Sequence, residues 1–397
     1  MKHNIGWNSN NMLDERINKI YQKELSRQKL TTELIASENF ASKAVMKLCG
    51  SEFTNKYAEG YPGARYYNGC EFMDEVETLA IDKLKDLYGC EFANVQPHSG
   101  ANANLAVYKA FLNPGDTILG MDLASGGHLT HGAPVTISGK WFNAHTYGVD
   151  EWGMIDYDEV ARLALEHKPN IIVAGASAYP RQIDWQAFRD IADDVGALLL
   201  VDMAHYSGLI AGGVYDNPVE YADVVTSTTH KTLRGPRGGI ILWNNPDYTR
   251  KINGAIFPGT QGGPLMNIIA AKAQAFTEAN TREFKDYSRK VIENAQALAK
   301  VLHNAKTLEV LTGGTDSHII LVSLVQSELS GREAADILEK HRITVNKNGI
   351  PNDPRNFKET SGIRIGTAAE TTRGMTKKEF EQLGHRIVNI LEDRSQW

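Results

Sequence analysis

Short apolar runs of the kind that form buried strands alternate with helical patterns through the middle of this chain. Such alternation is typical of βαβ units, which build a mostly parallel sheet with helices packed on its faces. The runs that we expect to form strands are residues 92–96, 117–121, 170–175, 197–201, 224–227 and 239–243. The sequence therefore predicts an α/β fold around one large sheet.

The pattern changes after Gly262-Gly263-Pro264. Beyond this point a long helical stretch leads to residues 318–325, which alternate like a strand, and residues 376–379 match a helix capping box. We expect three parts. They are an N-terminal arm with a helix over residues 1–30, a large α/β domain over 31–280 and a smaller C-terminal α+β domain over 281–397.

Composition narrows the class of protein. The 397 residues include 42 Lys plus Arg and 48 Asp plus Glu, a formal net charge of −6, and no basic run marks a nucleic-acid surface. No apolar stretch approaches the roughly 20 residues of a membrane span, and the polar start lacks the apolar core of a signal peptide. Three cysteines imply no disulfide framework. We therefore expect a cytoplasmic protein that binds neither nucleic acid nor membrane.

The run ALLLVDMAHYSG places Asp202 at the carboxyl end of a buried strand, where open α/β sheets bind their ligands. The next strand leads to His230 and Lys231. Pyridoxal phosphate enzymes pair a Schiff-base lysine with an aspartate on the pyridine nitrogen, and these two residues suit both roles. An ordinary Asp–Lys ion pair is the alternative, and it is the more frequent explanation for two such residues alone.

A third element lies in FANVQPHSGANAN, where a strand meets a helix at Ser99-Gly100. The free N–H groups and the dipole of a helix start can hold a phosphate. Such a start alone is a weak signal, because Ser-Gly begins many helices. Together with Asp202 and Lys231, however, it makes a cofactor site as plausible as an ion pair.

Histidines gather in the loops near the predicted strand ends. His128 and His131, at H-x-x-H spacing, and Asp202 and His205, at D-x-x-H spacing, could be metal ligands, although zinc needs about four ligands. Alternatively, some are buried hydrogen-bonding residues, and His128 could stack on a pyridine ring. We expect no metal. The loop histidines are His98, His128, His131, His205 and His230.

Arg364 in SGIRIGTAAETTRG is the last candidate. A guanidinium suits bidentate capture of a carboxylate. For any single arginine, however, a surface or interdomain ion pair is the commoner role.

At this point the sequence resembles serine hydroxymethyltransferase, a fold-type I pyridoxal phosphate enzyme. The resemblance extends from about Leu34 to Gly374. Its motifs, in chain order, are ELIASEN, TNKYAEGYPGARYY, NVQPHSGA, GGHLTHG, VDMAH, TTHKTLRGPRGG, FPGTQGGP, GGTDSH, NKNGIPNDP and SGIRIGT. It implies a large domain with a mostly parallel, seven-stranded sheet and a smaller α+β domain.

The resemblance also implies roles for individual residues. Lys231 would carry pyridoxal 5'-phosphate as a Schiff base. The implied catalytic residues are Lys231, Glu59, His128, Asp202, Tyr67 and His230. The implied cofactor-binding residues are Ser99, Gly100, Ala101, His128, Ser177, Asp202, His205 and Lys231, joined by Tyr57 and Gly263 from a partner subunit. The implied substrate-binding residues are Ser37, Tyr67 and Arg364, and the implied folate-binding residues are Glu59, Leu123, Gly127, His128, Leu129 and Asn348.

Activity and assembly follow from the same resemblance. It implies reversible transfer of the hydroxymethyl carbon of serine to tetrahydrofolate, which gives glycine and 5,10-methylenetetrahydrofolate. Because Tyr57, Glu59 and Gly263 would come from the partner, it implies a homodimer with shared active sites. Alternatives are a folate-independent aldolase or transaldolase for β-hydroxy amino acids, an α-methylserine enzyme, a metal-dependent hydrolase, or an inactive paralogue that binds a partner.

The chain departs from the family pattern at several places. Asn68 stands where Gly is common, and Asn102 stands where Gln is common. NFKETSG replaces the usual SPFVTSG, GTAAE replaces GTPA, and the C-terminus is shorter than in most relatives. We expect the loop over residues 356–360 to bear on the folate contacts and on the one-carbon acceptor.

Overall fold

The computed structural model of the protein describes residues 13–393 and 395. The first residues of the predicted arm lie outside this range. Within it, the helices are α1 (Glu15–Leu30), α2 (Lys43–Cys49), α3 (Glu71–Tyr88), α4 (Gly100–Phe111), α5 (Ile137–Trp141), α6 (Tyr157–His167), α7 (Trp185–Val195), α8 (Ser207–Ala211), α9 (Thr249–Ile256), α10 (Met266–Ala279), α11 (Arg282–His303), α12 (Gly331–Lys340), α13 (Ala368–Thr372) and α14 (Lys377–Glu392).

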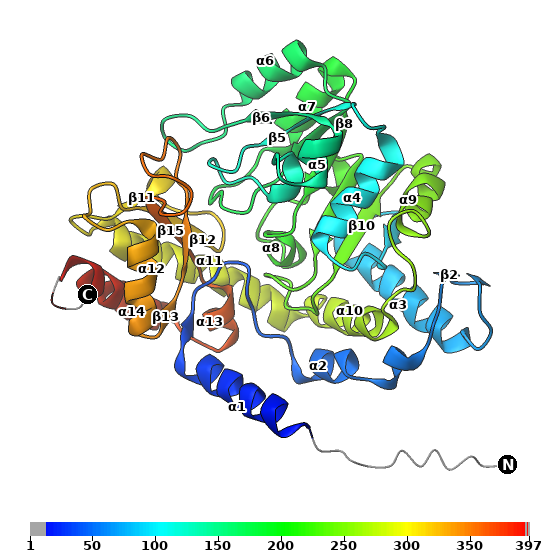
Figure 1. The fold of residues 1–397 in the computed structure, drawn as a ribbon, viewed down its shortest axis with the longest axis horizontal. Helices are drawn as coiled ribbons and strands as arrows, with labels where there is room; N and C mark the ends of the chain where they lie inside the picture. Colours follow the sequence, from blue (N-terminus) through cyan, green and yellow to red (C-terminus); the bar gives the residue numbers. More distant parts are fainter. Residues whose placement is uncertain (1–12, 394, 396–397) are drawn as a thin grey trace.

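The predicted alternation of strands and helices is confirmed as a seven-stranded sheet (Figure 1). All neighbouring strands are parallel except β10, which is antiparallel to both of its neighbours. In spatial order the strands are β4 (Phe92–Asn94), β10 (Gly239–Trp243), β9 (Val224–Thr228), β8 (Leu198–Asp202), β7 (Ile171–Ala174), β5 (Thr117–Met121) and β6 (Asn143–Tyr147).

The edge strand β6 is the one strand of this sheet that the apolar runs do not predict. Its sequence NAHTY is mostly polar and only partly buried, because one of its edges has no partner strand. Edge strands tolerate such residues, so hydrophobicity is a poor signal for them.

Side chains alternate between the two faces of the sheet, as the period of a strand requires. On one face Ile171 and Leu200 pack with α4 and α9, and on the other Ile172 and Leu199 pack with α3, α6, α7 and α10. Because both faces are covered, the central strands are almost entirely buried.

A second, antiparallel sheet has the strand order β11 (Glu309–Val310), β12 (Ile319–Ser323), β15 (Gly362–Gly366) and β14 (Asn346–Asn348). The predicted capping box is confirmed, since Thr376 caps α14 and Glu379 closes the box. Two short pairs complete the strands, namely β1 (Thr32–Glu33) with β13 (Ile343–Thr344), and the hairpin of β2 (Gly60–Tyr61) and β3 (Ala64–Arg65).

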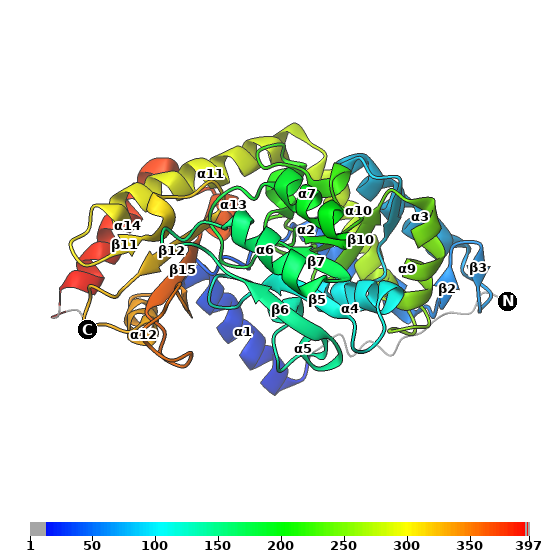
Figure 2. The ribbon, with the colours of Figure 1, turned by 90° about the horizontal axis from the view of Figure 1, so that it is seen from above.

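Helix α11 connects the cores of the two sheets, and Figure 2 shows it running along one side of both. Phe284 and Val291 pack in the core of the large sheet, whereas Leu298 and Leu302 pack in that of the small sheet. The division predicted at residue 280 falls between α10 and α11 and stays a prediction. Among the described residues, no helix combines the length and apolarity needed to cross a bilayer.

Candidate active site

A cavity of about 770 Å³ lies at the carboxyl edge of the large sheet and reaches the strands β14 and β15 of the small one. All but four of the predicted site residues line it. They are Ser37, Ser99, Gly100, Ala101, Leu123, Gly127, His128, Leu129, Ser177, Asp202, His205, His230, Lys231, Asn348 and Arg364. The sheet topology brings them together, because the loops that follow parallel strands meet at one edge.

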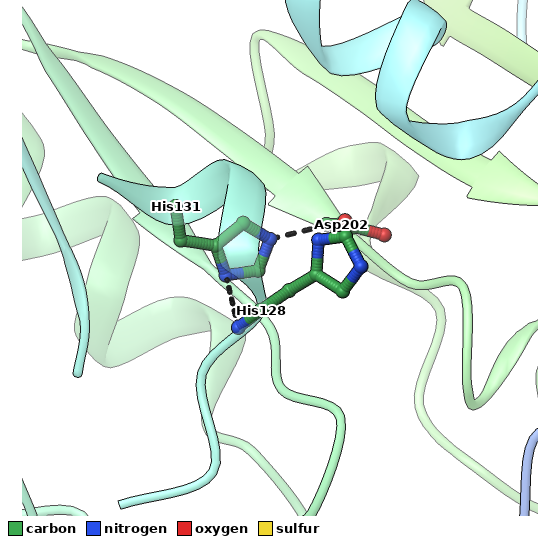
Figure 3. A group of neighbouring side chains, drawn as sticks. All are labelled: His128, His131 and Asp202. Carbon is green, nitrogen blue, oxygen red and sulfur yellow. Dashed lines mark hydrogen bonds and ion pairs between the residues drawn. The ribbon is translucent and has the colours of Figure 1, made fainter. Parts of the chain in front are cut away.

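Asp202, at the end of β8, is held by three hydrogen bonds. His131 Nε2 lies 3.0 Å from its Oδ2, Asn104 Nδ2 donates to Oδ2 at 2.9 Å, and the Ala204 N–H donates to Oδ1 at 3.1 Å. Figure 3 shows the His131 imidazole, from the short helix η2 (Leu129–His131), pointing at this carboxylate. Asp202 is therefore fixed in position.

The charge of Asp202 follows from the same contacts. Burial alone would raise the pKa of the carboxyl group, but the His131 hydrogen bond and the positive charge of Lys231 hold that pKa well below its usual range. Asp202 is therefore ionised at neutral pH. An ionised carboxylate in this place can stabilise a cationic ring nitrogen.

The orientation of His128 is set by Thr130. The Thr130 N–H donates to His128 Nδ1 at 3.2 Å, so this nitrogen is an acceptor and the ring proton is on Nε2. The Thr130 hydroxyl lies 2.7 Å from the same Nδ1 and accepts from Asn104 Nδ2 at 2.8 Å. Burial lowers the pKa of His128 to about 4, so the ring is neutral.

Among the described residues, His128, His131 and Asp202 form the one group of three or more whose potential metal ligands all lie within 4.8 Å of one another. His205, the other residue of the predicted D-x-x-H pair, does not belong to it. Asp202 Oδ2 already receives hydrogen bonds from His131 and Asn104. A metal ion would have to break both, so the donor set suits a hydrogen-bonded carboxylate better than a zinc site.

Lys231 lies in the loop after β9 and is 8% exposed. Burial lowers the pKa of its amine to about 8, although the charge of Asp202 opposes this shift. A substantial fraction of the amine is therefore neutral near pH 8, which makes Lys231 a nucleophile suited to a Schiff base.

The start of α4 forms an anion cradle. The Ser99 hydroxyl accepts from the Asn102 N–H at 3.1 Å and donates to Asn102 Oδ1 at 2.8 Å, so the unusual Asn102 completes the cap. The N–H groups of Gly100 and Ala101 have no partner within the helix, as at any helix start. A Cβ at Gly100 would lie 2.7 Å from Thr228 Cγ2, which explains the glycine.

Arg364 projects from β15 into the cavity. Its Nη1 donates to the Ser177 carbonyl at 2.6 Å and its Nε donates to Asn346 Oδ1 at 3.0 Å. Burial lowers the pKa of Arg364 to about 10, which still leaves it charged at neutral pH. A fixed cation that keeps Nη2 free of described protein partners can bind a carboxylate.

Four predicted residues lie outside this cavity and form a second group, which we call the hairpin cluster: Tyr57, Glu59, Tyr67 and Gly263. Tyr67 donates to Glu59 Oε2 at 3.3 Å, and the rings of Tyr57 and Tyr67 are 5.3 Å apart. A Cβ at Gly263 would lie 3.1 Å from the Tyr57 ring. In both views the β2–β3 hairpin lies at the end of the molecule away from the small sheet (Figures 1 and 2).

Sequence reasoning missed Asn104 and Thr226, and it did not assign His131 to the Asp202 carboxylate. Thr226 donates to Asn104 Oδ1 at 2.6 Å, and this bond orients the amide that holds Asp202. The available signal was a polar residue on the buried face of a helix, since Asn104 lies among Ala103, Ala106 and Val107.

Comparisons with known proteins agree with this geometry. The family model described as serine hydroxymethyltransferase matches residues 10–387. A protein of that name from Wolbachia pipientis (subsp. Culex pipiens) is 58% identical over 389 residues, 97% of this chain and 91% of the relative. Its namesake from Nitrosospira multiformis is 61% identical over 370 residues, 93% of this chain and 88% of the relative. That from Dechloromonas aromatica is 58% identical over 380 residues, 96% of this chain and 91% of the relative.

Proposed function

The chain belongs to the serine hydroxymethyltransferase family, and on that premise we propose how its own residues carry out the family's reaction. The protein is a pyridoxal phosphate-dependent enzyme. It reversibly transfers the hydroxymethyl carbon of serine to tetrahydrofolate and yields glycine and 5,10-methylenetetrahydrofolate. The observation that carries the assignment of roles is the burial of Lys231 and ionised Asp202 in one cavity with the start of α4.

The residues of the cavity fit the cofactor. Pyridoxal phosphate, when bound, supplies a ring that accepts electrons from the α-carbon of an attached amino acid. Lys231 is the residue that would bind it covalently, Asp202 would hold a proton on the ring nitrogen, and Ser99, Gly100 and Ala101 would bind the phosphate. His128 would stack on the ring, and Ser177 and His205 would lie by its phenolic oxygen.

Substrate binding is assigned to the side of the cavity formed by the small sheet. Arg364 would bind the substrate carboxylate together with Ser37, because it is a fixed cation whose Nη2 has no hydrogen-bond partner among the described residues. We assign the folate side to Leu123, Gly127, His128, Leu129 and Asn348. Phe357, from the altered loop, lines the same cavity and is 77% exposed, so it is placed to affect the acceptor.

We propose that Glu59 moves the proton of the serine hydroxyl and that His230, beside Lys231, assists in catalysis. Glu59 and Tyr67 are hydrogen-bonded to each other but do not line the cavity of their own chain. A homodimer in which each hairpin cluster completes the partner's cavity resolves this separation. The 56% exposure of Tyr57 supports it, as does α1, which buries none of its residues.

We further propose a cytoplasmic enzyme without a nucleic-acid partner. Its net charge of −6 disfavours binding to phosphate backbones. All three cysteines are free, as expected in a reducing compartment.

Steady-state kinetics with purified holoenzyme tests the function. We expect serine cleavage to require tetrahydrofolate, and we expect the visible absorbance of the holoenzyme to disappear on reduction with borohydride. Serine cleavage at an equal rate without folate would instead support the folate-independent aldolase.

A further inference from the structure

Two buried histidines contact each other behind the cavity. His205 lines the cavity, whereas His318, the first residue after GGTDS, does not. His205 Nδ1 lies 3.3 Å from His318 Nε2, and the two rings are nearly parallel at 16°. His318 is fully buried and His205 is 2% exposed. No role in the reaction as proposed above uses His318.

The position of the proton in this pair follows from a third group. His318 Nε2 also lies 3.1 Å from the carbonyl oxygen of Ala36. A carbonyl can only accept, so His318 Nε2 must carry a hydrogen. The same N–H faces His205 Nδ1, which therefore has to accept. In a neutral ring, the proton of His205 is then on Nε2.

Both rings are neutral, so this reasoning applies to them. Burial lowers the pKa of His318 to about 3 and that of His205 well below its ordinary value, and the positive charges of Arg364 and Lys231 act in the same direction. His318 Nδ1 is buried and has no hydrogen-bond partner in the described part of the chain, as expected for the nitrogen without a proton.

We propose that His318 is a positioning residue that fixes the tautomer of His205, so that His205 presents an Nε2–H donor to the cavity. This inference rests on the proposed function, in which the phenolic oxygen of the cofactor lies beside His205. An N–H donor there stabilises a phenolate, whereas the opposite tautomer would present a lone pair and repel it.

The same contact connects two parts of the site. Ala36 precedes Ser37, which we assign to the substrate carboxylate, and a Cβ at Gly366 would lie 2.3 Å from Ala36 Cα. The His318 N–H therefore also anchors the segment that carries Ser37 against the small sheet. A residue buried only for packing would need neither bond.

Cofactor affinity tests the proposal, measured by titrating apoenzyme with pyridoxal 5'-phosphate and following absorbance. His318→Leu fills the space but removes the hydrogen-bond donor. His318→Gln keeps an N–H donor at the same number of bonds from Cα as Nε2 of the histidine. We expect His318→Leu to weaken binding about tenfold and His318→Gln to remain within about threefold of wild type. Val322→Ala in β12, the strand that follows His318, lies at a fully buried position in the core of the small sheet and controls for lost stability.

A double variant separates action through His205 from a general structural effect. If His318 acts through His205, His205→Leu combined with His318→Leu should bind cofactor no more weakly than His205→Leu alone. Multiplied effects, an unchanged His318→Leu, or an equal loss in Val322→Ala would overturn the proposal. Failure of the wild type itself to bind the cofactor would instead contradict the proposed function.

Neutron diffraction of the wild-type holoenzyme gives an answer that does not depend on any variant folding. We expect deuterium on Nε2 of both His205 and His318. Deuterium on His205 Nδ1 would overturn the proposal.

Discussion

The cavity and the hairpin cluster differ in how far one chain completes them. In the cavity, Asp202 and Lys231 are buried, and Asp202 receives hydrogen bonds from its own chain. In the hairpin cluster, Tyr57 and Tyr67 are 56% and 46% exposed, and Glu59 is bonded to Tyr67 rather than to any group of the cavity. One chain can therefore build a cofactor site, but the acid that we assign to proton transfer lies outside that chain's cavity.

Electrostatics separates the two regions in the same way. Burial shifts the pKa of Lys231 and His128 strongly within the cavity. In the hairpin cluster, the charge of Glu59 raises the pKa of Tyr67. Burial shifts the pKa values of residues in the cavity, whereas residues of the hairpin cluster would be buried to the same extent only against another surface.

The largest single effect is expected from the cavity. Asp202→Asn should lower kcat/KM for serine by roughly 10²- to 10³-fold, because an amide cannot stabilise a protonated ring nitrogen. His131→Asn keeps the carboxylate but removes one of its hydrogen bonds, and should cost only about tenfold. Steady-state kinetics of both variants tests this order. A loss in Asp202→Asn no larger than that in His131→Asn would show that the carboxylate is not the important group.

A smaller effect should appear in the stability of the apoenzyme. The pKa of Lys231 is about 8 when folded and about 10.4 in an unfolded chain, so between these values the unfolded state binds more protons. The unfolding free energy contributed by Lys231 therefore rises with pH in this window, by about 1.4 kcal/mol per unit.

Urea unfolding at pH 7.5 and 9.5 measures it, with Lys231→Met as the reference that lacks the group. We expect the wild type to gain about 2 kcal/mol relative to Lys231→Met over this interval. A constant difference would mean that Lys231 is solvated in the apoenzyme and that the cavity is not dry without a partner.

The smallest effect is expected from a conservative change at one tyrosine of the hairpin cluster. Tyr67→Phe removes the hydrogen bond to Glu59 but keeps the ring that contacts Tyr57. We expect kcat to fall about fivefold while cofactor affinity stays within about twofold. A large loss of cofactor affinity, measured by titration of the apoenzyme, would place Tyr67 with the cavity rather than with the cluster.

Much of the large sheet and of the cavity could be predicted from the sequence. The apolar runs are enough to predict the central strands, since strands buried on both faces are rich in apolar residues. The position at the end of a strand is enough to predict that Asp202 and Lys231 lie in the site. The polar strand β6 was not predicted, because an edge strand need not contain an apolar run. The role of Glu59 came from the family motifs alone, whereas Arg364 was a candidate for binding a carboxylate that those motifs favoured over an ordinary ion pair.

The supporting residues could not be predicted. Asn104 and His131 act on Asp202, which lies 98 and 71 positions away from them along the chain. His318 acts on His205, which lies 113 positions away. Such contacts depend on tertiary packing, which no local period encodes. The family motifs implied that Tyr57, Glu59 and Gly263 serve a partner's site, but no local pattern showed that Tyr67 would lie with them.

The division of the site between two copies is tested most directly by hybrid dimers. Lys231→Ala and Glu59→Gln chains, each of which we expect to be inactive alone, are unfolded, mixed in equal amounts and refolded together. Half of the dimers should then be hybrids, each with one intact site, so activity should return to about a quarter of the wild-type value. If each chain instead uses its own Glu59, every site in the mixture lacks one residue. Activity would then stay at the level of the separate variants, and this result would contradict the shared site.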